Sequence, residues 1–225
     1  KNDHPETLKK GEDSDFFKNQ GLSVGDEKNS EINQISVDHK PITLSKGQSE
    51  TIDGIHITHA DTDKMTDKER NVMKINSDNK VIIDLQHDQY QGKEITVTYD
   101  NLNNSYYLEN IDDKTNKIKI SKKIKISKIE RTFSEIEPGD TIFKSDGKTP
   151  KGADGVYDEC HGPQLIIYND PSDGFFYNNI EQVSVKDIYY DDKGDEITFK
   201  DKDGDKNKAW IFVTSLNSNG VRNDS

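Results

Sequence analysis

Residues 183–199 read VSVKDIYYDDKGDEITF. Apolar and polar side chains alternate over residues 183–190 and again at Ile197 and Phe199, and the glycine-containing stretch 191–195 separates the two runs. A period of two is typical of a half-buried strand, and Asp with Gly favours a tight turn. The pattern therefore predicts a β-hairpin.

The same texture extends outward over the chain from about residue 46. Short alternating runs are separated by clusters of Gly, Asp and Asn, and about eleven short strands result. Besides 183–190, the predicted strands are residues 52–58, 80–85, 94–99, 106–108, 117–120, 124–129, 141–144, 164–168, 196–200 and 209–215. This predicts an all-β fold, a two-sheet antiparallel β-sandwich with long loops and one or two short helices, whose last three strands form a meander.

Two domain-level segments are expected. Residues 1–45 are dominated by charged and small polar side chains, which predicts a flexible N-terminal segment, although residues 32–37 (INQISV) could dock as a helix turn or an edge strand. Residues 46–225 are predicted to form the sandwich. Within them, residues 61–73 contain Thr66 followed by Glu69, a pattern that could cap a short helix.

Composition excludes several partners. The 225 residues carry a formal charge of −12, and such a surface repels nucleic-acid phosphates and anionic lipid headgroups. No apolar stretch is long enough to span a bilayer, so neither nucleic-acid binding nor direct membrane insertion is expected. The lysines of residues 117–128 are interpreted as the solvated face of a strand. The chain begins with Lys1, which indicates a removed leader or an excised piece, and hence export.

Catalytic motifs are missing from the sequence. Cys160 stands alone beside Asp158 and Glu159, so a buried structural role is favoured over a reactive thiolate. There is no GxSxG elbow, phosphate-binding glycine loop or kinase signature. Carboxylate pairs occur by chance in so acidic a chain, and a glycosidase is the weakest reading. The protein is predicted not to be an enzyme.

Metal binding is weakly indicated. A weak calcium candidate places oxygen ligands at alternate positions, namely Asp201, Asp203, Asp205 and Asn207. Its glycine is not at the EF-hand position, so a plain hairpin turn is favoured and no cofactor is expected. His56 and His59 would face opposite sides of a strand and are interpreted as surface or rim residues rather than zinc ligands.

The strongest binding signal lies in residues 149–179, where aromatic rings are interleaved with Asn and Asp. Rings pack on the apolar face of a sugar while amides and carboxylates bind its hydroxyls. The alternative is that the rings fill the core and that Asn-Asp-Pro-Ser-Asp-Gly forms turns. The candidate ligand-binding residues are Tyr157, Asp158, His161, Asn178 and Trp210, although for Trp210 a core position is the stronger reading.

Three segments carry a resemblance to a known group: NDPSDGFFYNN at residues 169–179, IYYDDKGDEITFKD at 188–201 and AWIFVTSLNSNG at 209–220. They resemble the β-sandwich adhesin domains of streptococcal surface proteins, including the variable lectin-like domain of antigen I/II proteins and the N-terminal domains of glycolipid-binding, factor-H-binding adhesins. No binding residue is carried over from them.

The resemblance implies an extracellular protein anchored to the cell wall of a Gram-positive bacterium. The first functional hypothesis is an adhesin for a host glycan or glycolipid that contains galactose. The second is an immune-evasion module that binds a host protein such as the complement regulator factor H, its acidic face meeting a basic surface.

Overall fold

The computed structural model describes residues 22–27, 30–61, 66, 80–85, 90–113, 118–139, 163–178 and 180–199. These residues contain thirteen β-strands and no α-helix. The chain divides into two compact units. The larger comprises Ser23–Tyr107 and Ile124–Ile197, and the smaller comprises Lys1–Leu22, Leu108–Lys123 and Thr198–Ser225.

The larger unit contains two five-stranded sheets, and every pairing within them is antiparallel. The first sheet has the order β13-β10-β7-β2-β3. Its strands are β13 (Ile180–Tyr190), β10 (Lys128–Pro138), β7 (Ile95–Asp100), β2 (Glu31–Val37) and β3 (Lys40–Ile42). The second has the order β12-β11-β6-β5-β4. Its strands are β12 (Phe175–Asn178), β11 (Gln164–Tyr168), β6 (Lys80–Asp84), β5 (Ile55–His59) and β4 (Ser49–Ile52).

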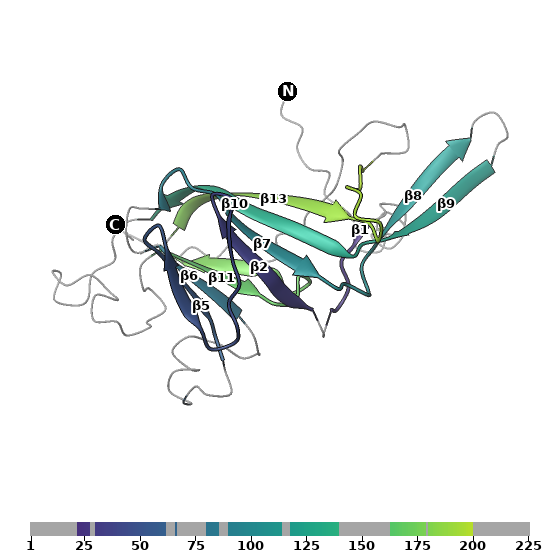
Figure 1. Ribbon diagram of the computed structural model, residues 1–225. Helices are drawn as coiled ribbons and strands as arrows, with labels where there is room; N and C mark the ends of the chain where they lie inside the picture. Colours follow the sequence, from purple (N-terminus) through teal and green to yellow (C-terminus); the bar gives the residue numbers. More distant parts are fainter. Residues whose placement is uncertain are drawn as a thin grey trace, which may run out of the picture. The chain divides into compact units, whose positions relative to one another are not determined.

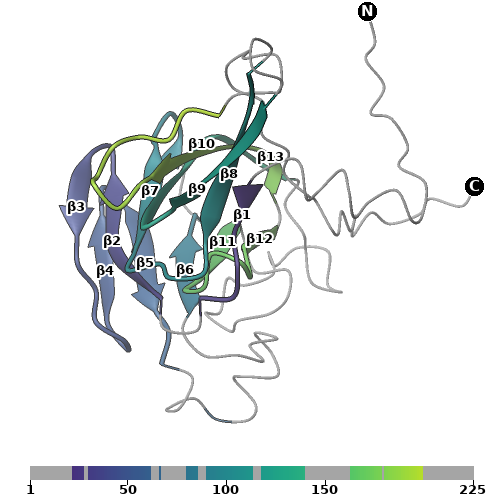
Figure 2. The ribbon, with the colours of Figure 1, turned by 90° about the vertical axis from the view of Figure 1, so that its right-hand side faces the viewer.

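The two sheets pack as the layers of a sandwich (Figures 1 and 2). Phe133 of β10 meets Phe175 of β12 edge to face, with ring centroids 4.9 Å apart. Alternate side chains of β7 and β10 are buried, as a half-buried strand requires. The continuous apolar runs of β6 and β11 are buried on both faces of their sheet. The predicted all-β sandwich is therefore confirmed.

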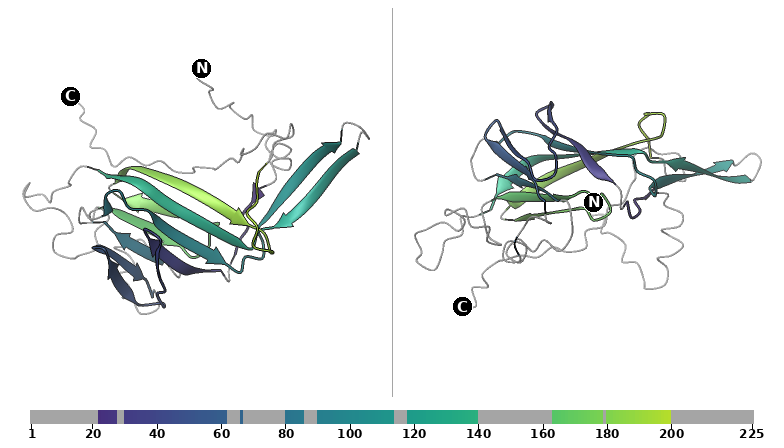
Figure 3. Two further views of the ribbon diagram at one scale, coloured as in Figure 1. Left: turned by 45° about the horizontal axis from the view of Figure 1, so that its top comes forward. Right: turned by 60° about the horizontal axis from the view of Figure 1, so that its bottom comes forward.

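A third sheet has the order β1-β8-β9. Its strands are β1 (Leu22–Ser23), β8 (Tyr106–Asp113) and β9 (Ile118–Lys125). Figure 3 shows β8 and β9 side by side as a hairpin. The sequence predicted strands at 106–108 and 117–120 but only two sheets, so the third sheet and the length of its strands were not predicted.

The strand predictions succeed where the apolar runs are continuous. Residues 164–168 are β11 without any shift, β6 ends one residue earlier than predicted, and β7 is shifted by one residue at both ends. The predicted strand 52–58 is wrong: Asp53 and Gly54, both with positive φ, turn the chain between β4 and β5. The predicted strand 196–200 is reduced to a bridge between Glu196 and Tyr190.

The predicted domain boundary at residue 45 follows β3. Strands β2 and β3 before it belong to the same sheet as β7, and β2 lies between its neighbours rather than at an edge. The predicted strands 141–144 and 209–215 and Cys160 lie outside the described residues. Of the predicted helix at 61–73, only Asp61 and Thr66 are described, and neither is helical.

Candidate functional site

Three loops of the larger unit meet at one end of the sandwich, and their contacts define a candidate site. We call it the loop cluster. It consists of the described residues 23–27 and 30 before β2, residues 101–105 after β7, and the turn 169–174 between β11 and β12. The turn is part of the Asn- and Asp-rich stretch in which the sequence predicted binding.

Glu27 joins the first loop to the second. Its carboxylate is 3% exposed and accepts three hydrogen bonds: Oε1 from Asn104 N at 2.6 Å and Ser105 Oγ at 2.9 Å, and Oε2 from Asn103 N at 2.7 Å. Charged acceptors make stronger hydrogen bonds than neutral ones. The buried carboxylate therefore acts as a clamp that fixes the backbone of residues 103–105.

The turn 169–174 is fixed by the first loop. Glu27 N donates to Asp170 Oδ2 at 2.9 Å, and Ser30 Oγ donates to Asn169 O at 2.8 Å. Inside the turn, Ser172 N donates to Asp170 Oδ1 at 2.8 Å and Gly174 adopts φ +75°. The Asx turn and the glycine are what Asn-Asp-Pro-Ser-Asp-Gly predicted.

The base of the turn is held by side chains from both sheets. Tyr99 OH of β7 donates to the backbone oxygen of Tyr168 at 2.9 Å. The ammonium of Lys80 lies 4.4 Å from the centre of the Tyr168 ring. Burial lowers the pKa of Lys80, and the charge of Asp173 opposes this shift. The lysine thus contributes a cation–π contact beneath the turn.

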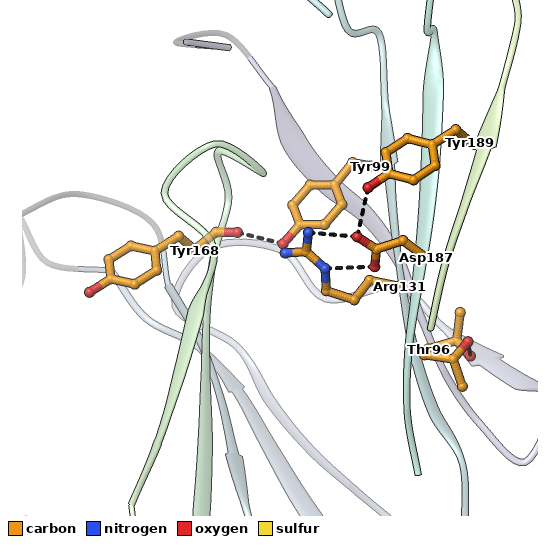
Figure 4. A network of polar contacts seen from close by, with 7 residues as sticks. Thr96, Tyr99, Arg131, Tyr168, Asp187 and Tyr189 are labelled. Atoms are coloured by element: carbon orange, nitrogen blue, oxygen red, sulfur yellow. Dashed lines mark hydrogen bonds and ion pairs between the residues drawn. The ribbon is translucent and has the colours of Figure 1, made fainter. Parts of the chain in front are cut away.

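A buried ion pair lies within the first sheet close to Tyr99 (Figure 4). Arg131 Nε and Nη2 donate to the two carboxylate oxygens of Asp187 at 2.8 and 3.0 Å, and Tyr189 OH donates to Asp187 Oδ2 at 2.9 Å. Burial alone would lower the pKa of Arg131, but the hydrogen bond and charge of Asp187 outweigh it and raise the pKa. Burial raises the pKa of Tyr99.

This network is structural. Arg131 and Asp187 face each other across β10 and β13, so the pair joins these two strands. The guanidinium also lies 5.4 Å from the ring centre of Phe175 in the second sheet. Nη1 of Arg131 is buried without a hydrogen-bond partner among the described residues, so only one side of the guanidinium is paired. We interpret the pair as specifying the register of the two strands more than adding stability. Their effect on the loop cluster passes through Tyr99, which holds Tyr168 in place.

The exposed surface of the loop cluster is polar and acidic. Its exposed side chains are Asp26, Asn101, Asn103, Asn104, Ser172 and Asp173. The pKa of Asp173 is raised, first by partial desolvation and then by the neighbouring charges of Asp170 and Asp26. The surface thus offers carboxylate, amide and hydroxyl groups, which suit a ligand rich in hydroxyls.

The structure does not test the predicted binding residues. Asn178 lies in β12, where its backbone pairs with Gln164, but its side chain is not described. Tyr157, Asp158, His161 and Trp210 lie outside the described residues, as do the calcium candidates Asp201, Asp203, Asp205 and Asn207. Within the described part of the chain, no group of His, Cys, Asp and Glu is arranged to hold a metal ion.

His59 was wrongly placed by the sequence. His56 and His59 do face opposite sides of β5, and His56 is exposed. His59, however, is 7% exposed rather than on the surface, because its face of β5 points into the sandwich. Its ring bonds Leu44 O through Nδ1 at 3.1 Å and the Asn169 amide through Nε2 at 3.3 Å.

Several residues of the loop cluster were missed, chiefly Glu27, Ser30 and His59. Their partners are 76 to 143 residues away along the chain, so local patterns cannot reveal them. One residue in the sequence could have indicated that these loops meet. Gly25 precedes Asp26 and Glu27, and a Cβ on Gly25 would overlap the backbone oxygen of Asn104. A glycine at such a position indicates close approach of two backbone segments.

Residues 5–225 match the family model described as glucan-binding protein C. The chain belongs to this family. A solved structure of the glucan binding protein C of Streptococcus mutans is 19% identical, with a TM-score of 0.40; the match covers 80% of this chain and 43% of that one. The chain thus spans less than half of that protein, for which a role in both sucrose-independent and sucrose-dependent adherence is described. No curated protein matches the chain.

Family membership agrees with the resemblance to streptococcal adhesins, but it does not support the glycolipid-binding or factor-H-binding type of adhesin. In the described residues, no helix is long and apolar enough to cross a membrane.

Proposed function

We propose that this chain is an extracellular, surface-associated adhesin domain that binds a glucan at the loop cluster and catalyses no reaction. The family match supports a glucan as the ligand class. We place the glucan site at the loop cluster because hydrogen bonds fix the backbone of its three loops. Exposed polar side chains surround this backbone, namely Asp26, Asn103, Asn104 and Asp173. Because these loops are held before binding, little entropy is lost when a sugar is bound.

The chemistry of the cluster suits a neutral glycan. Sugar hydroxyls can donate to the carboxylates of Asp26 and Asp173 and exchange hydrogen bonds with the amides. Tyr168 is a half-buried aromatic ring of this region; burial and then the charge of Asp173 raise its pKa. A glucan carries no charge, so the acidity of the cluster does not repel it.

Two finer predictions remain as alternatives. A galactose-containing glycolipid would use the same hydroxyl chemistry, whereas a host protein such as factor H would require a basic surface opposite the acidic loops. Neither alternative has support from the family match. Binding of factor H would differ from binding of a glucan in salt dependence, because screening weakens charge attraction and leaves neutral sugar contacts largely unchanged. A galactose-containing glycan shares the low salt dependence of a glucan and is distinguished from it only by comparing affinities.

Binding to a panel of soluble linear α- and β-glucans, galactose-containing oligosaccharides and factor H, measured by calorimetry at low and high salt, tests the proposal. We expect a glucan to bind with little salt dependence and the double variant Ser172→Ala, Asp173→Asn to bind it at least about tenfold more weakly. Asp53→Asn, at the other end of the sandwich, is the matched control. If the double variant and the control bind the glucan with equal affinity, the glucan does not bind at the loop cluster. If only galactosides or factor H bind, the ligand is not a glucan.

A further inference from the structure

The hydrogen bonds of His59 determine its tautomer. The backbone oxygen of Leu44 can only accept, so Nδ1, at 3.1 Å from it, must carry the proton. In the neutral ring Nε2 is then an acceptor, and it meets the Asn169 Nδ2 donor at 3.3 Å. Both polar atoms of a buried, neutral imidazole are thus in use.

The amide of Asn169 is only half satisfied by this arrangement. Because Nδ2 must face His59, Oδ1 points the other way, where it is buried and has no hydrogen-bond partner among the described residues. A buried acceptor without a donor costs free energy. In the amide orientation that suits neutral His59, the Asn169 side-chain oxygen therefore lacks a hydrogen bond.

A proton on Nε2 reverses this preference. The ring would then present N–H groups on both sides, and the Nε2 proton would face the Asn169 NH₂ group, donor against donor. Rotating the amide by half a turn places Oδ1 against Nε2–H and restores this hydrogen bond, but the ring then carries a positive charge in the interior, which costs free energy. Histidine is the side chain that ordinarily changes charge between about pH 5 and 8.

We propose that His59 and Asn169 form an acid-responsive latch on the loop cluster, in which protonation of His59 turns the Asn169 amide and loosens the turn 169–174. Asn169 is the first residue of the turn, and its backbone oxygen accepts from Ser30 Oγ. The next residue, Asp170, accepts from Glu27 N. A change at Asn169 therefore reaches all three loops through direct contacts.

Four charged residues lie on segments next to His59 or Asn169. They are Lys46, beside Gly47, whose N donates to His59 O; Asp61, two residues after His59; Lys80, whose backbone oxygen accepts from Ala60 N; and Asp170, next to Asn169. Lys46 and Asp61 lie 3.8 Å from each other, and Asp170 is hydrogen-bonded to Glu27 N and Ser172 N. In the described hydrogen bonds of His59, neither ring nitrogen meets a carboxylate. Buried charge without a counter-ion is costly, so the acid form holds the turn less firmly.

The latch itself is tested without ligand by an NMR titration of the ¹⁵N-labelled protein from about pH 7.5 to about pH 5. We expect the Nδ1-protonated tautomer of His59 at the upper pH, and then a shift of the Asn169 side-chain NH₂ signals with the same midpoint as the His59 ring. His56→Gln, which removes the exposed histidine of the same strand, must leave both curves unchanged. An Nε2-protonated ring at the upper pH, or Asn169 signals that ignore the titration of His59, would overturn the proposal.

The effect on binding rests on the proposed function. For a glucan that binds, we expect affinity about fivefold or more lower at the acid end than at the neutral end. In His59→Gln, whose neutral amide oxygen can still accept from Asn169, this ratio should be smaller than in the wild type. Identical ratios in the wild type and His59→Gln would refute the regulation while leaving glucan binding intact. A working latch in the NMR titration without any glucan binding would instead refute the proposed function alone.

Discussion

The two ends of the sandwich close in different ways. The loop cluster is held by buried hydrogen bonds from Glu27, Ser30 and His59 to segments far away in the sequence. The opposite end, which we call the hairpin end, consists of the turns at residues 38–39 and 53–54 and residues 91–94 before β7. There the turns are two residues long and adopt positive φ, and exposed ion pairs connect them.

Two carboxylates of the hairpin end have lysine partners. Lys40 Nζ lies 3.0 Å from Asp53 Oδ2, and Lys93 Nζ lies 3.6 Å from the same carboxylate oxygen and 3.9 Å from Asp38 Oδ2. The charged residues within the loop cluster are all carboxylates: Asp26, Glu27, Asp170 and Asp173. Tight turns and screened ion pairs suffice to close a sandwich. The buried clamps of the loop cluster are thus more than closure requires, which is what a binding surface would need.

The largest effect is expected at Glu27. Glu27→Ala leaves the donors of Asn103, Asn104 and Ser105 without their acceptor, and should lower the free energy of unfolding by about 3 kcal/mol. Urea unfolding measures this loss. Glu27→Gln, which keeps one acceptor oxygen, should lose less. A loss for Glu27→Ala no greater than that of the hairpin-end variant Asp53→Asn would mean that the clamp does not distinguish the two ends.

The next effect is a backbone clash at Gly25. Gly25→Ala places a Cβ against the backbone of Asn104 and should destabilise the protein by about 1–3 kcal/mol. Gly92→Ala at the hairpin end is the comparison: a Cβ there meets nothing within 4 Å, but φ is +70°, so only backbone strain of about 1 kcal/mol is expected. Thermal unfolding of both variants would show whether the clash in Gly25→Ala or the backbone strain in Gly92→Ala lowers the stability more. A neutral Gly25→Ala would show that the two loops separate easily.

A smaller effect of opposite sign is expected at Asp173. Its pKa is raised in the folded state, so the folded protein binds this proton more tightly than the unfolded chain, and ionisation above the folded pKa destabilises the fold. Asp173→Asn should therefore stabilise the protein near neutral pH, by well under about 1 kcal/mol because solvent screens the site. The gain should disappear below the unfolded pKa. Calorimetric melting at several pH values checks this, and a loss of stability at neutral pH would contradict it.

The smallest effect is expected at Asp53. Its hydrogen bond to Lys40, followed by the charges of Lys40 and Lys93, lowers its pKa. The contribution is present above the unfolded pKa and is lost as pH falls through the folded pKa. Because the group is fully exposed, Asp53→Asn should melt within error of the wild type at high salt and only slightly lower at low salt. A large, salt-independent drop would show that the hairpin end, too, depends on buried contacts.

Sequence reasoning was most successful where burial shapes a short run directly. The stretches at residues 80–85 and 164–168 are apolar on both faces, and they form strands β6 and β11. The turn 169–174 was predicted because Asp, Pro and Gly restrict the backbone locally. The residues 52–58 were misassigned because the apolar alternation was given more weight than the Asp53-Gly54 pair, which is a strong signal for a two-residue hairpin turn.

The candidate site was predictable only in part. Its acidic turn lay within the stretch that the sequence singled out, and the polar character of the turn was expected. The clamp by Glu27 was not, because a carboxylate in an acidic chain is expected to lie on the surface, and its burial depends on donors 76 to 78 residues away. The burial of His59 depends on which face of β5 points into the sandwich.

The sequence by itself determined the all-β class, the main strands, the turns at Asp- and Gly-rich positions and the net charge, because these depend on the period of side chains and on local backbone preferences. Only the tertiary structure decided that loops from three parts of the chain meet, that Glu27, Asn169 and His59 are buried, and that Arg131 pairs with Asp187. The physical reason is that a hydrogen bond between distant residues leaves no periodic trace. It exists only once sheet order has brought its donor and acceptor within about 3 Å of each other.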